Sequence, residues 1–320
     1  MIWLTWRQHR LEGLITALFV VAVAGLVGGL ILAAQPLLEQ IKHVCTFVVD
    51  DSCGRALIAF DTRFGAFQQP VNLAFFVMPV LSGLFIGAPL LAREFEQGTD
   101  QIVWAQGITR RRWFLVKLAV LASATAVVAG ILAVAGQEWS TARPDNSYSQ
   151  WYAFDMQGPE FVAYALFSLA LGVAAGAAIG KSVPAMAAVL VVFVGARAAI
   201  ELFARRNFLP PVELEMTGPL VSGQGQAWVI GNQRPADLHG KTIGMDQFEQ
   251  ITNACLNPVP GVKLGNLDLT NCWHEHGVKL MQTYQPAERF PLFQGIEAAI
   301  FVIAAIALLG FAFWLVSRRA

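Results

Sequence analysis

Six long apolar stretches alternate with polar segments along the chain. They are residues 13–34, 71–91, 113–136, 158–180, 183–204 and 293–316. Each has roughly the 20 residues that an α-helix needs to cross about 30 Å of hydrocarbon. The first is too long for the apolar part of a cleaved signal peptide, so we take it as a retained span. The pattern therefore predicts an all-α integral membrane protein with six transmembrane helices.

Composition supports this prediction. Hydrophobic residues make up 56% of the chain, charged residues 14%, and the mean hydropathy is +0.53. Soluble domains usually carry about a quarter charged residues. The formal net charge is zero, so no basic footprint for binding a nucleic acid is present.

The polar segment between the fifth and sixth spans, residues 205–292, is too long for a simple connection. A short strand is expected at 226–230, and helices are expected at 246–254 and 271–284. We therefore predict a small mixed domain between the two spans. The other long polar segment, 35–69, is expected to be a loop.

The two ends of the chain complete the domain plan. Tryptophan and arginine within residues 1–12 favour the headgroup level, which suggests an interfacial helix; an ordinary basic flank of the first span is the alternative. Residues 1–204 would then hold that helix, spans one to five and a cytoplasmic coupling loop at 93–112. Residues 205–292 would form an extracellular domain, and residues 293–320 the sixth span and a cytoplasmic C-terminus.

Basic residues are sorted between the two sides of the six spans. Segments 1–12, 93–117, 180–182 and 317–320 fall on one side and hold ten of the 22 Lys and Arg in about 45 residues. The opposite segments hold eleven in about 145 residues. Because loops rich in Lys and Arg stay inside, we expect a multi-pass protein of the plasma membrane with both termini in the cytoplasm.

Cysteine placement gives the same orientation. With both termini inside, Cys45, Cys53, Cys255 and Cys272 all lie outside, where disulfides persist. The simplest pairing joins Cys45 to Cys53 and Cys255 to Cys272, each within one segment. Four cysteines allow three pairings, and four free thiols are the alternative.

Motifs of catalytic type are out of context. The Gly-Lys-Ser ending of residues 175–182 is similar to a phosphate loop, but it closes an apolar helix instead of opening one after a strand. All five histidines lie outside the spans, which disfavours a protease within the membrane. His274 and His276 could join Cys272 in a metal-ligand set, but an exterior cysteine more often forms a disulfide. We therefore expect neither an ATPase site in this chain nor a metal centre.

Two charged residues fall inside the fifth span. Arg197 and Glu201 are spaced i, i+4, so they can pair on one face of the helix. The pair could fix helix packing, or it could form a polar patch that lines a transport pathway.

The segment between the second and third spans carries dense charge. Within it, Thr99 can cap a helix whose first turn holds Asp100, and Gly107 would end that helix. A helix of under two turns is not stable alone in water. It therefore needs support from the ends of the spans or from a partner protein.

The same segment carries a resemblance to a known family. Residues 94–99, EFEQGT, followed by 109–113, TRRRW, and by Lys117, resemble the loop of ATP-binding-cassette (ABC) exporter permeases of the type-2 membrane superfamily. YQPAERF at 284–290 and QGIE at 294–297 look like a pattern in actinobacterial members. The six-span plan is similar too, whereas the large outer insert departs from the smallest members and leaves the substrate open.

This resemblance implies a permease subunit without its own ATPase, surrounded by membrane lipid. Two separate cytoplasmic ABC ATPase subunits would bind ATP and magnesium, and a second permease copy or a sister permease would complete the path. The cargo would be an amphipathic or hydrophobic drug, peptide or lipid. Segment 94–107 would be the coupling helix, and residues 1–10 the connecting helix. The residues expected to couple to the ATPase are Glu94, Phe95, Glu96, Gln97, Gly98, Thr99, Asp100, Ile102, Trp104, Arg110 and Arg111.

A function from another class stays open at this point. The chain could be a membrane-anchored sensor or binding protein that uses its outer domain, with the charged loop contacting a signalling partner. A complex with a soluble ATPase would separate the two functions.

Overall fold

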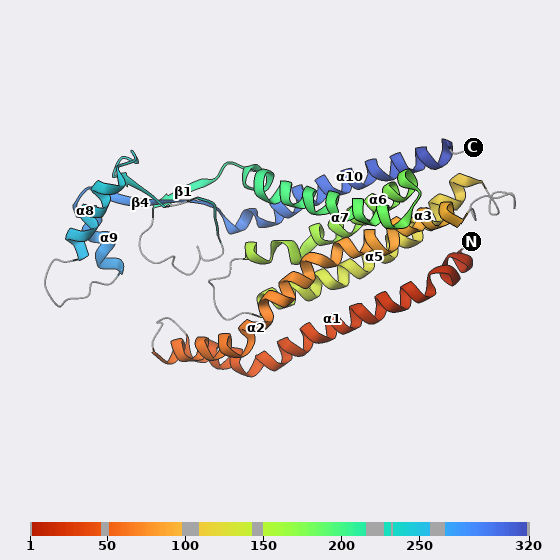
Figure 1. Cartoon of the computed structure of the whole chain (residues 1–320). Helices are drawn as coiled ribbons and strands as arrows, with labels where there is room; N and C mark the ends of the chain where they lie inside the picture. Colours follow the sequence, from red (N-terminus) through yellow and green to blue (C-terminus); the bar gives the residue numbers. More distant parts are fainter. Residues whose placement is uncertain are drawn as a thin grey trace. The chain divides into compact units, whose positions relative to one another are not determined.

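A computed structural model describes residues 2–45, 51–97, 109–142, 150–215, 227–231, 233–256 and 266–318. The chain divides into two compact units (Figure 1). Unit 1 comprises Met1–Asp145, Ala153–Leu202 and Leu292–Ala320, and unit 2 comprises Asn146–Tyr152 and Phe203–Pro291. Unit 1 contains most of the long helices, and unit 2 contains a small sheet with two helices.

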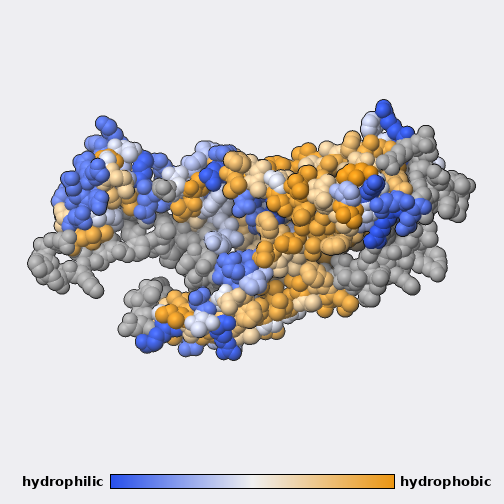
Figure 2. Space-filling model, viewed as in Figure 1, coloured by the Kyte–Doolittle hydropathy of each residue, from blue (hydrophilic) through white to orange (hydrophobic). Residues whose placement is uncertain are grey.

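Within the described residues, six helical segments are long and apolar enough to cross a membrane, as predicted. The elements that form them are α1 (Ile2–Val44), α2 with η1 and α3 (Asp51–Leu81, Ser82–Gly87, Ala88–Gln97), α5 (Arg110–Thr141), η2 with α6 (Gln150–Met156, Gly158–Ile179), α7 with η3 and η4 (Ser182–Ala199, Ile200–Ala204, Arg205–Asn207), and η5 with α10 (Ala287–Arg289, Phe290–Arg318). Hydrophobic residues cover much of the helical surface in Figure 2, as expected where lipid surrounds it.

The loop predicted at 35–69 is wrong, because helices occupy most of it. α1 continues to Val44 and α2 begins at Asp51, and the Cys45–Cys53 disulfide joins their ends. Ala34 and Leu38 of α1 pack against Phe64 of α2 in a buried cluster. Apolar residues at helical spacing therefore extend the two helices beyond the apolar runs that the sequence analysis counted as spans.

Helix α1 has no break between the expected interfacial segment and the first span. It runs for 43 residues, which is about 65 Å at the rise of an α-helix and roughly twice the thickness of hydrocarbon. Residues 2–12 therefore continue the same helix as the span.

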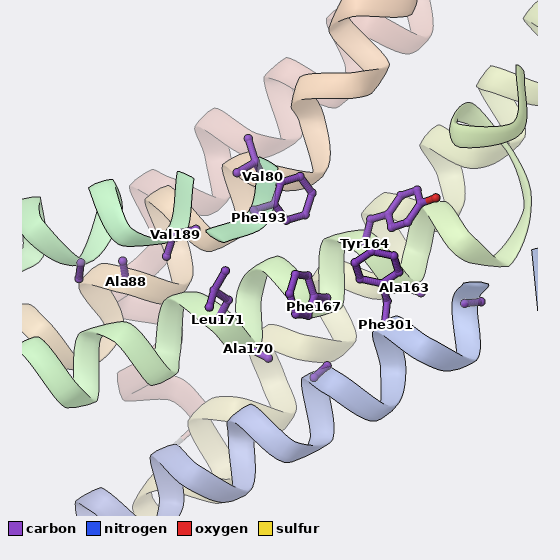
Figure 3. Packing of buried hydrophobic residues seen from close by; sticks show 13 residues of the cluster. Val80, Ala88, Ala163, Tyr164, Phe167, Ala170, Leu171, Val189, Phe193 and Phe301 are labelled. Carbon is purple, nitrogen blue, oxygen red and sulfur yellow. The ribbon is translucent and has the colours of Figure 1, made fainter. Parts of the chain in front are cut away.

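Helix α6 lies closest to the centre of unit 1. In its most apolar window 72% of the residues are buried, against 22% for the windows of α5, α7 and α10. Figure 3 shows aromatic side chains filling the space between α6 and its neighbours. The ring of Phe301 from α10 makes edge contacts with Tyr164 and Phe167 of α6 at centroid distances of 5.0 and 5.1 Å.

The segment α2–η1–α3 packs on α6 backbone to backbone. A Cβ atom at Gly172 would meet the backbone of Gly83 and Ala88, and one at Gly176 would meet the carbonyl of Ala88. Gly172 and Gly176, one helical turn apart, therefore form a bare face on α6 against which the other backbone packs. Small residues permit such approach where lipid offers no hydrophobic drive for helices to associate.

The π-helical turn η1 was not predicted. It lies in the middle of this close contact. A π-helical turn departs from the α-helical hydrogen-bond pattern, so backbone groups beside it need partners from outside their own helix. Ser168 of α6 supplies two of them: its Oγ accepts a hydrogen bond from Gly83 N and donates to Val80 O, both at 3.2 Å. Ser82 Oγ lies 2.8 Å from the carbonyl oxygens of Pro79 and Ala165. The irregular turn is thus satisfied by its neighbour helix.

Unit 2 confirms the predicted mixed domain between the fifth and sixth spans. Its sheet is built on β4 (Val278–Gln285), and all pairings are antiparallel. β4 pairs with β1 (Val212–Glu215), β2 (Trp228–Val229) and β3 (Arg234–Asp237). The other three strands therefore all pair with β4, the last strand in the sequence. The sheet forms only when β4 is present.

Two helices, α8 (Met245–Leu256) and α9 (Asn266–Glu275), accompany the sheet and are joined by the Cys255–Cys272 disulfide. The helix expected at 271–284 is wrong. Gly277, with φ of +73°, follows the end of α9, and from Val278 onward buried and partly exposed residues alternate as in a strand. The change of period at a glycine is the signal that the sequence analysis missed.

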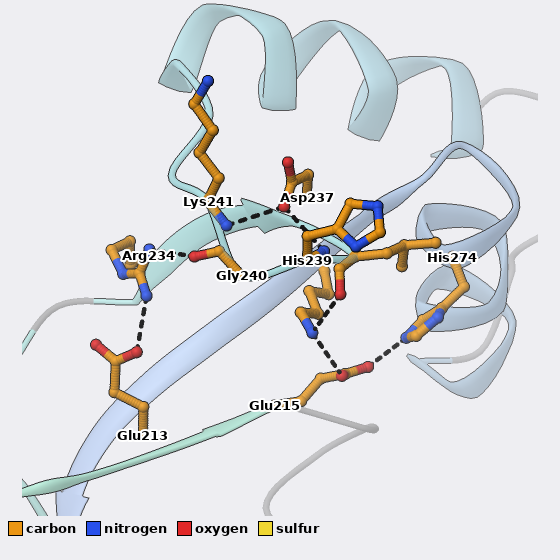
Figure 4. A network of polar contacts seen from close by, with 10 residues as sticks. Glu213, Glu215, Arg234, Asp237, His239, Gly240, Lys241 and His274 are labelled. Carbon is orange, nitrogen blue, oxygen red and sulfur yellow. Dashed lines mark hydrogen bonds and ion pairs between the residues drawn. The ribbon is translucent and has the colours of Figure 1, made fainter.

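Polar contacts fix the turn after β3 in unit 2 (Figure 4). The Asp237 carboxylate accepts hydrogen bonds from the backbone N–H groups of His239 and Lys241, both at 2.9 Å. These bonds hold the pKa of Asp237 below its usual value. The stability that they contribute is present above about pH 4, the ordinary pKa of Asp, and is lost as pH falls through the lowered pKa.

The α6 contact with η1 and α3 gives a first prediction. Gly172→Ala should destabilise unit 1 by about 1–3 kcal/mol, because the new methyl group meets backbone that cannot turn aside. Gly195→Ala is the matched control, since a Cβ at Gly195 meets nothing within 4 Å. Unfolding of the purified variants in mixed detergent micelles measures both, and equal stability of the two would contradict the close packing.

Candidate functional site

Several charged helix ends meet at one end of unit 1. The last turn of α3, the first turn of α5, the turn between α6 and α7 and the last turn of α10 lie there, on the right in Figure 1 with the start of α1. Direct contacts hold them together: Glu96 of α3 reaches Ser182 of α7, and the Arg111 guanidinium of α5 lies 5.9 Å from the ring centroid of Phe313 in α10. We take this end as the candidate functional site.

Glu94, expected to couple to an ATPase, pairs within the chain. Its carboxylate accepts a hydrogen bond from the Lys117 ammonium of α5. The two side chains are only 15% and 8% exposed, and Lys117 also lies 4.9 Å from the centre of the Trp113 ring. The pair therefore ties the end of α3 to α5 in a mostly buried setting.

Glu96 caps the fifth span, α7. Its carboxylate accepts hydrogen bonds from Ser182 N, at 3.0 Å, and from Ser182 Oγ, at 2.9 Å. The N-cap residue of α7, Lys181, makes no capping hydrogen bond of its own. Glu96 thus supplies both the acceptor and the negative charge that a helix N-terminus favours, from a residue 86 positions earlier in the chain.

The remaining coupling candidates divide into two groups. Phe95 packs against the apolar cluster of helix ends that includes Leu91 and Trp113, Gln97 is exposed, and Arg111 contacts Phe313. Residues 94–97 of the expected coupling helix form the end of α3. The rest of that helix lies outside the described residues, with Gly98, Thr99, Asp100, Ile102 and Trp104, as does the side chain of Arg110 at the start of α5.

Sequence reasoning did not identify the partners of the two glutamates. Lys117 was noted as a basic residue, and Ser182 was noted as the end of a false phosphate loop. The sequence does indicate a helix end at Gly180, whose φ is +69° in the structure. The next helix begins after Lys181, which cannot cap it, and this missing cap was the available sign that another residue supplies one. Sequence spacing could not show that Glu96 is the residue that caps α7.

Arg197 is buried but does not use the partner expected for it. Its guanidinium forms an ion pair with Asp155, with Nη2 3.1 Å from Oδ1, and lies 4.0 Å from the centre of the Tyr164 ring. Glu201 is exposed. The expected i, i+4 pair is therefore replaced by a contact to the turn before α6, because Arg197 points into the bundle and Glu201 points out of it.

Other polar residues of this buried region were missed or barely noted. Tyr164 Oη lies 2.6 Å from Glu297 Oε1, and Gln294 Nε2 donates to Glu160 Oε1 at 2.5 Å. The signal was a carboxylate near the start of each of two apolar helices, Glu160 in the first turn of α6 and Glu297 eight residues into α10. At such positions sequence alone favours a residue at the membrane surface.

Both disulfides have the predicted pairing. His276 Nδ1 lies with the sulfur atoms of Cys255 and Cys272 in a group whose atoms are within 4.8 Å of one another. The two sulfurs are bonded to each other, so neither is the thiolate that a metal ion would need.

The Glu94–Lys117 pair gives a second prediction. Glu94→Ala should cost about 3–5 kcal/mol, because it leaves the Lys117 ammonium buried without its partner. The double variant Glu94→Gln with Lys117→Met should recover most of that loss. Glu39→Ala is the control, because the Glu39–Lys42 pair is exposed and its loss should leave the unfolding midpoint unchanged. A double variant no more stable than Glu94→Ala would contradict the role of the pair.

Comparison with known proteins agrees with this arrangement. A family model described as ABC-2 membrane transporter related matches residues 15–205, which is more than half of the chain. The match covers the first five spans and the helix ends around Glu94 and Glu96, and it stops close to the start of the long segment of unit 2. No curated protein and no solved structure matches the chain significantly.

The family match and the six apolar helical segments lead to the same conclusion. A permease of this family has no ATPase domain and works with ABC ATPase subunits. The chain belongs to the ABC-2 membrane transporter related family and is a multi-pass membrane permease of an ABC transporter.

Proposed function

We propose that this permease is the membrane subunit of an exporter, and that its ATPase partner docks on the segment between α3 and α5. The observation that carries the proposal is the anchoring of α3, which leads into that segment. Glu94 binds Lys117 of α5, and Glu96 caps α7. A displacement of the end of α3 would therefore act on two neighbouring spans at once.

ATP and magnesium would bind the partner, not this chain. Two cytoplasmic ABC ATPase subunits and a second permease, either another copy or a sister chain, would complete the assembly. The faces of α7 and α10 support the pairing, because many of their large apolar side chains, such as Val191 and Ile306, are exposed. Lipid covers whatever the second permease leaves free. Glu201, exposed on the α7 side, would line the pathway beside that partner.

The candidate site would face the cytoplasm with both termini, and unit 2 would lie outside. Its disulfide and the one at the far end of α1 support this orientation, because disulfides persist in the oxidising exterior. Outward transport follows from the family resemblance of the charged loop, and the cargo would be amphipathic or hydrophobic, such as a drug, a peptide or a lipid.

Thiol labelling tests the orientation. All four native cysteines are in disulfides, so single added cysteines report cleanly. Gln97→Cys and Asp246→Cys place a thiol at exposed positions of the candidate site and of unit 2. A membrane-impermeant maleimide on intact cells should label residue 246 and leave residue 97 unlabelled until the membrane is permeabilised. The opposite pattern would overturn the orientation.

Reconstitution with each cytoplasmic ABC ATPase encoded beside the permease gene tests the function. The full permease in liposomes should bind one such ATPase and raise its hydrolysis rate. Replacing residues 100–106 with a Gly-Ser linker of equal length should lower that stimulation at least tenfold, which corresponds to about 1.4 kcal/mol. The same replacement at 143–149, between α5 and α6, is the control and should leave stimulation unchanged.

Two results would contradict the proposal. If no ATPase binds the intact permease, the chain fits a sensor or binding protein that uses unit 2. If stimulation survives the replacement of 100–106 at full rate, the ATPase docks elsewhere.

A further inference from the structure

A buried polar cluster in unit 1 has no role in the proposed ATPase docking. It comprises Asp155, which precedes α6, Glu160 and Tyr164 of α6, Arg197 of α7 and Glu297 of α10. Glu160 is 0% exposed and Glu297 is 1% exposed. Ionisable residues inside a membrane are expensive to bury and usually mark a function.

Glu160 has only a neutral partner. Its Oε1 accepts a hydrogen bond from the side-chain amide of Gln294, which also donates to the carbonyl of Gln157 at 3.2 Å. Its Oε2 is buried and has no hydrogen-bond partner. Among the residues that the structure describes, no Lys or Arg pairs with Glu160, and Arg197 pairs with Asp155 instead.

An ionised carboxylate does not fit this position. Removing its charge from water carries a large penalty unless a cation or several donors replace the water, and here no cation among the described residues does so. The donors are the side-chain amide of Gln294 and the backbone N–H of Glu160 itself. The helix dipole favours negative charge in the first turn of α6, where Glu160 lies, but that effect is smaller than the penalty for a fully buried charge. The neutral acid is therefore the form that the surroundings of Glu160 support.

Tyr164 connects the other two acids of the cluster. Its Oη lies 3.0 Å from Asp155 Oδ1 and 2.6 Å from Glu297 Oε1, both hydrogen-bond distances. A phenol has one proton to donate. The two carboxyl groups therefore share one phenol proton, and Arg197 is the cation that faces Asp155.

We propose that the Glu160–Gln294 contact between α6 and α10 is a proton-binding site. Glu160 holds a proton while the two helices are packed together. When they separate and water reaches the carboxyl group, the O–H bond breaks, the proton passes to water and the carboxylate remains. Separation of α6 from α10 is thereby coupled to release of one proton, a property that the family match does not assign.

Infrared spectroscopy of the purified permease in lipid tests the site directly, without an ATPase. The neutral-pH spectrum should contain the C=O stretching band of a protonated carboxyl group, and Glu160→Gln should remove one carboxyl group's share of it. Gln294→Leu should keep that band but shift its frequency, since the amide hydrogen bond is lost. Glu138→Gln, at an exposed glutamate, is the matched control and should leave the band unchanged.

Stability against pH provides the second readout. Alkaline pH should lower the unfolding midpoint of the wild-type protein by forcing charge onto Glu160, and Glu160→Gln, which is neutral at every pH, should reduce that dependence. A protonated-carboxyl band that Glu160→Gln leaves unchanged would overturn the proposal. So would failure of Glu160→Gln to fold at neutral pH, because an amide has nearly the shape of the neutral acid and lacks only the anionic form.

Discussion

Backbone groups inside hydrocarbon must find hydrogen-bond partners within the protein. The contact of α6 with α2–η1–α3 supplies such partners where the second span departs from α-helical geometry, at η1. The π-helical turn Ser82–Gly87 is satisfied only because Ser168 reaches it, and Ser168 reaches it only because Gly83 and Gly172 lack side chains. One close approach thus decides where the second and fourth spans lie, and the remaining helices of unit 1 pack around them.

The same central helix connects two polar regions of opposite character. Toward the chain termini, α6 ends at Gly180, and the turn that follows presents Ser182 to Glu96. At its start, α6 carries Glu160 and Tyr164 among the buried acids. Charged groups near the termini hold helix ends together by ion pairs and caps, whereas the buried acids combine one ion pair, Asp155 with Arg197, with hydrogen bonds from Tyr164 and the amide of Gln294. A change in the packing of α6 would therefore alter the contacts of both polar regions.

The contacts of Glu94 and Glu96 change how the family's charged segment is understood. Both glutamates bind other spans of the same chain and so fix the end of α3 that leads into the segment. Gln97, the last residue of α3, is exposed. Loss of transport on replacing either glutamate would therefore reflect lost positioning as much as lost docking.

The sequence by itself determined the six spans, the mixed domain between the last two, both disulfide pairings and the family. Hydropathy over some 20 residues is a local property, and a Cys pair within one segment has few competitors. Only the tertiary structure decided that helices occupy 35–44 and 51–69, that Arg197 pairs with Asp155 instead of Glu201, and that Glu96 caps α7. These outcomes depend on which helix faces meet, and a side chain's partner across 86 positions is set by packing, which no local pattern records.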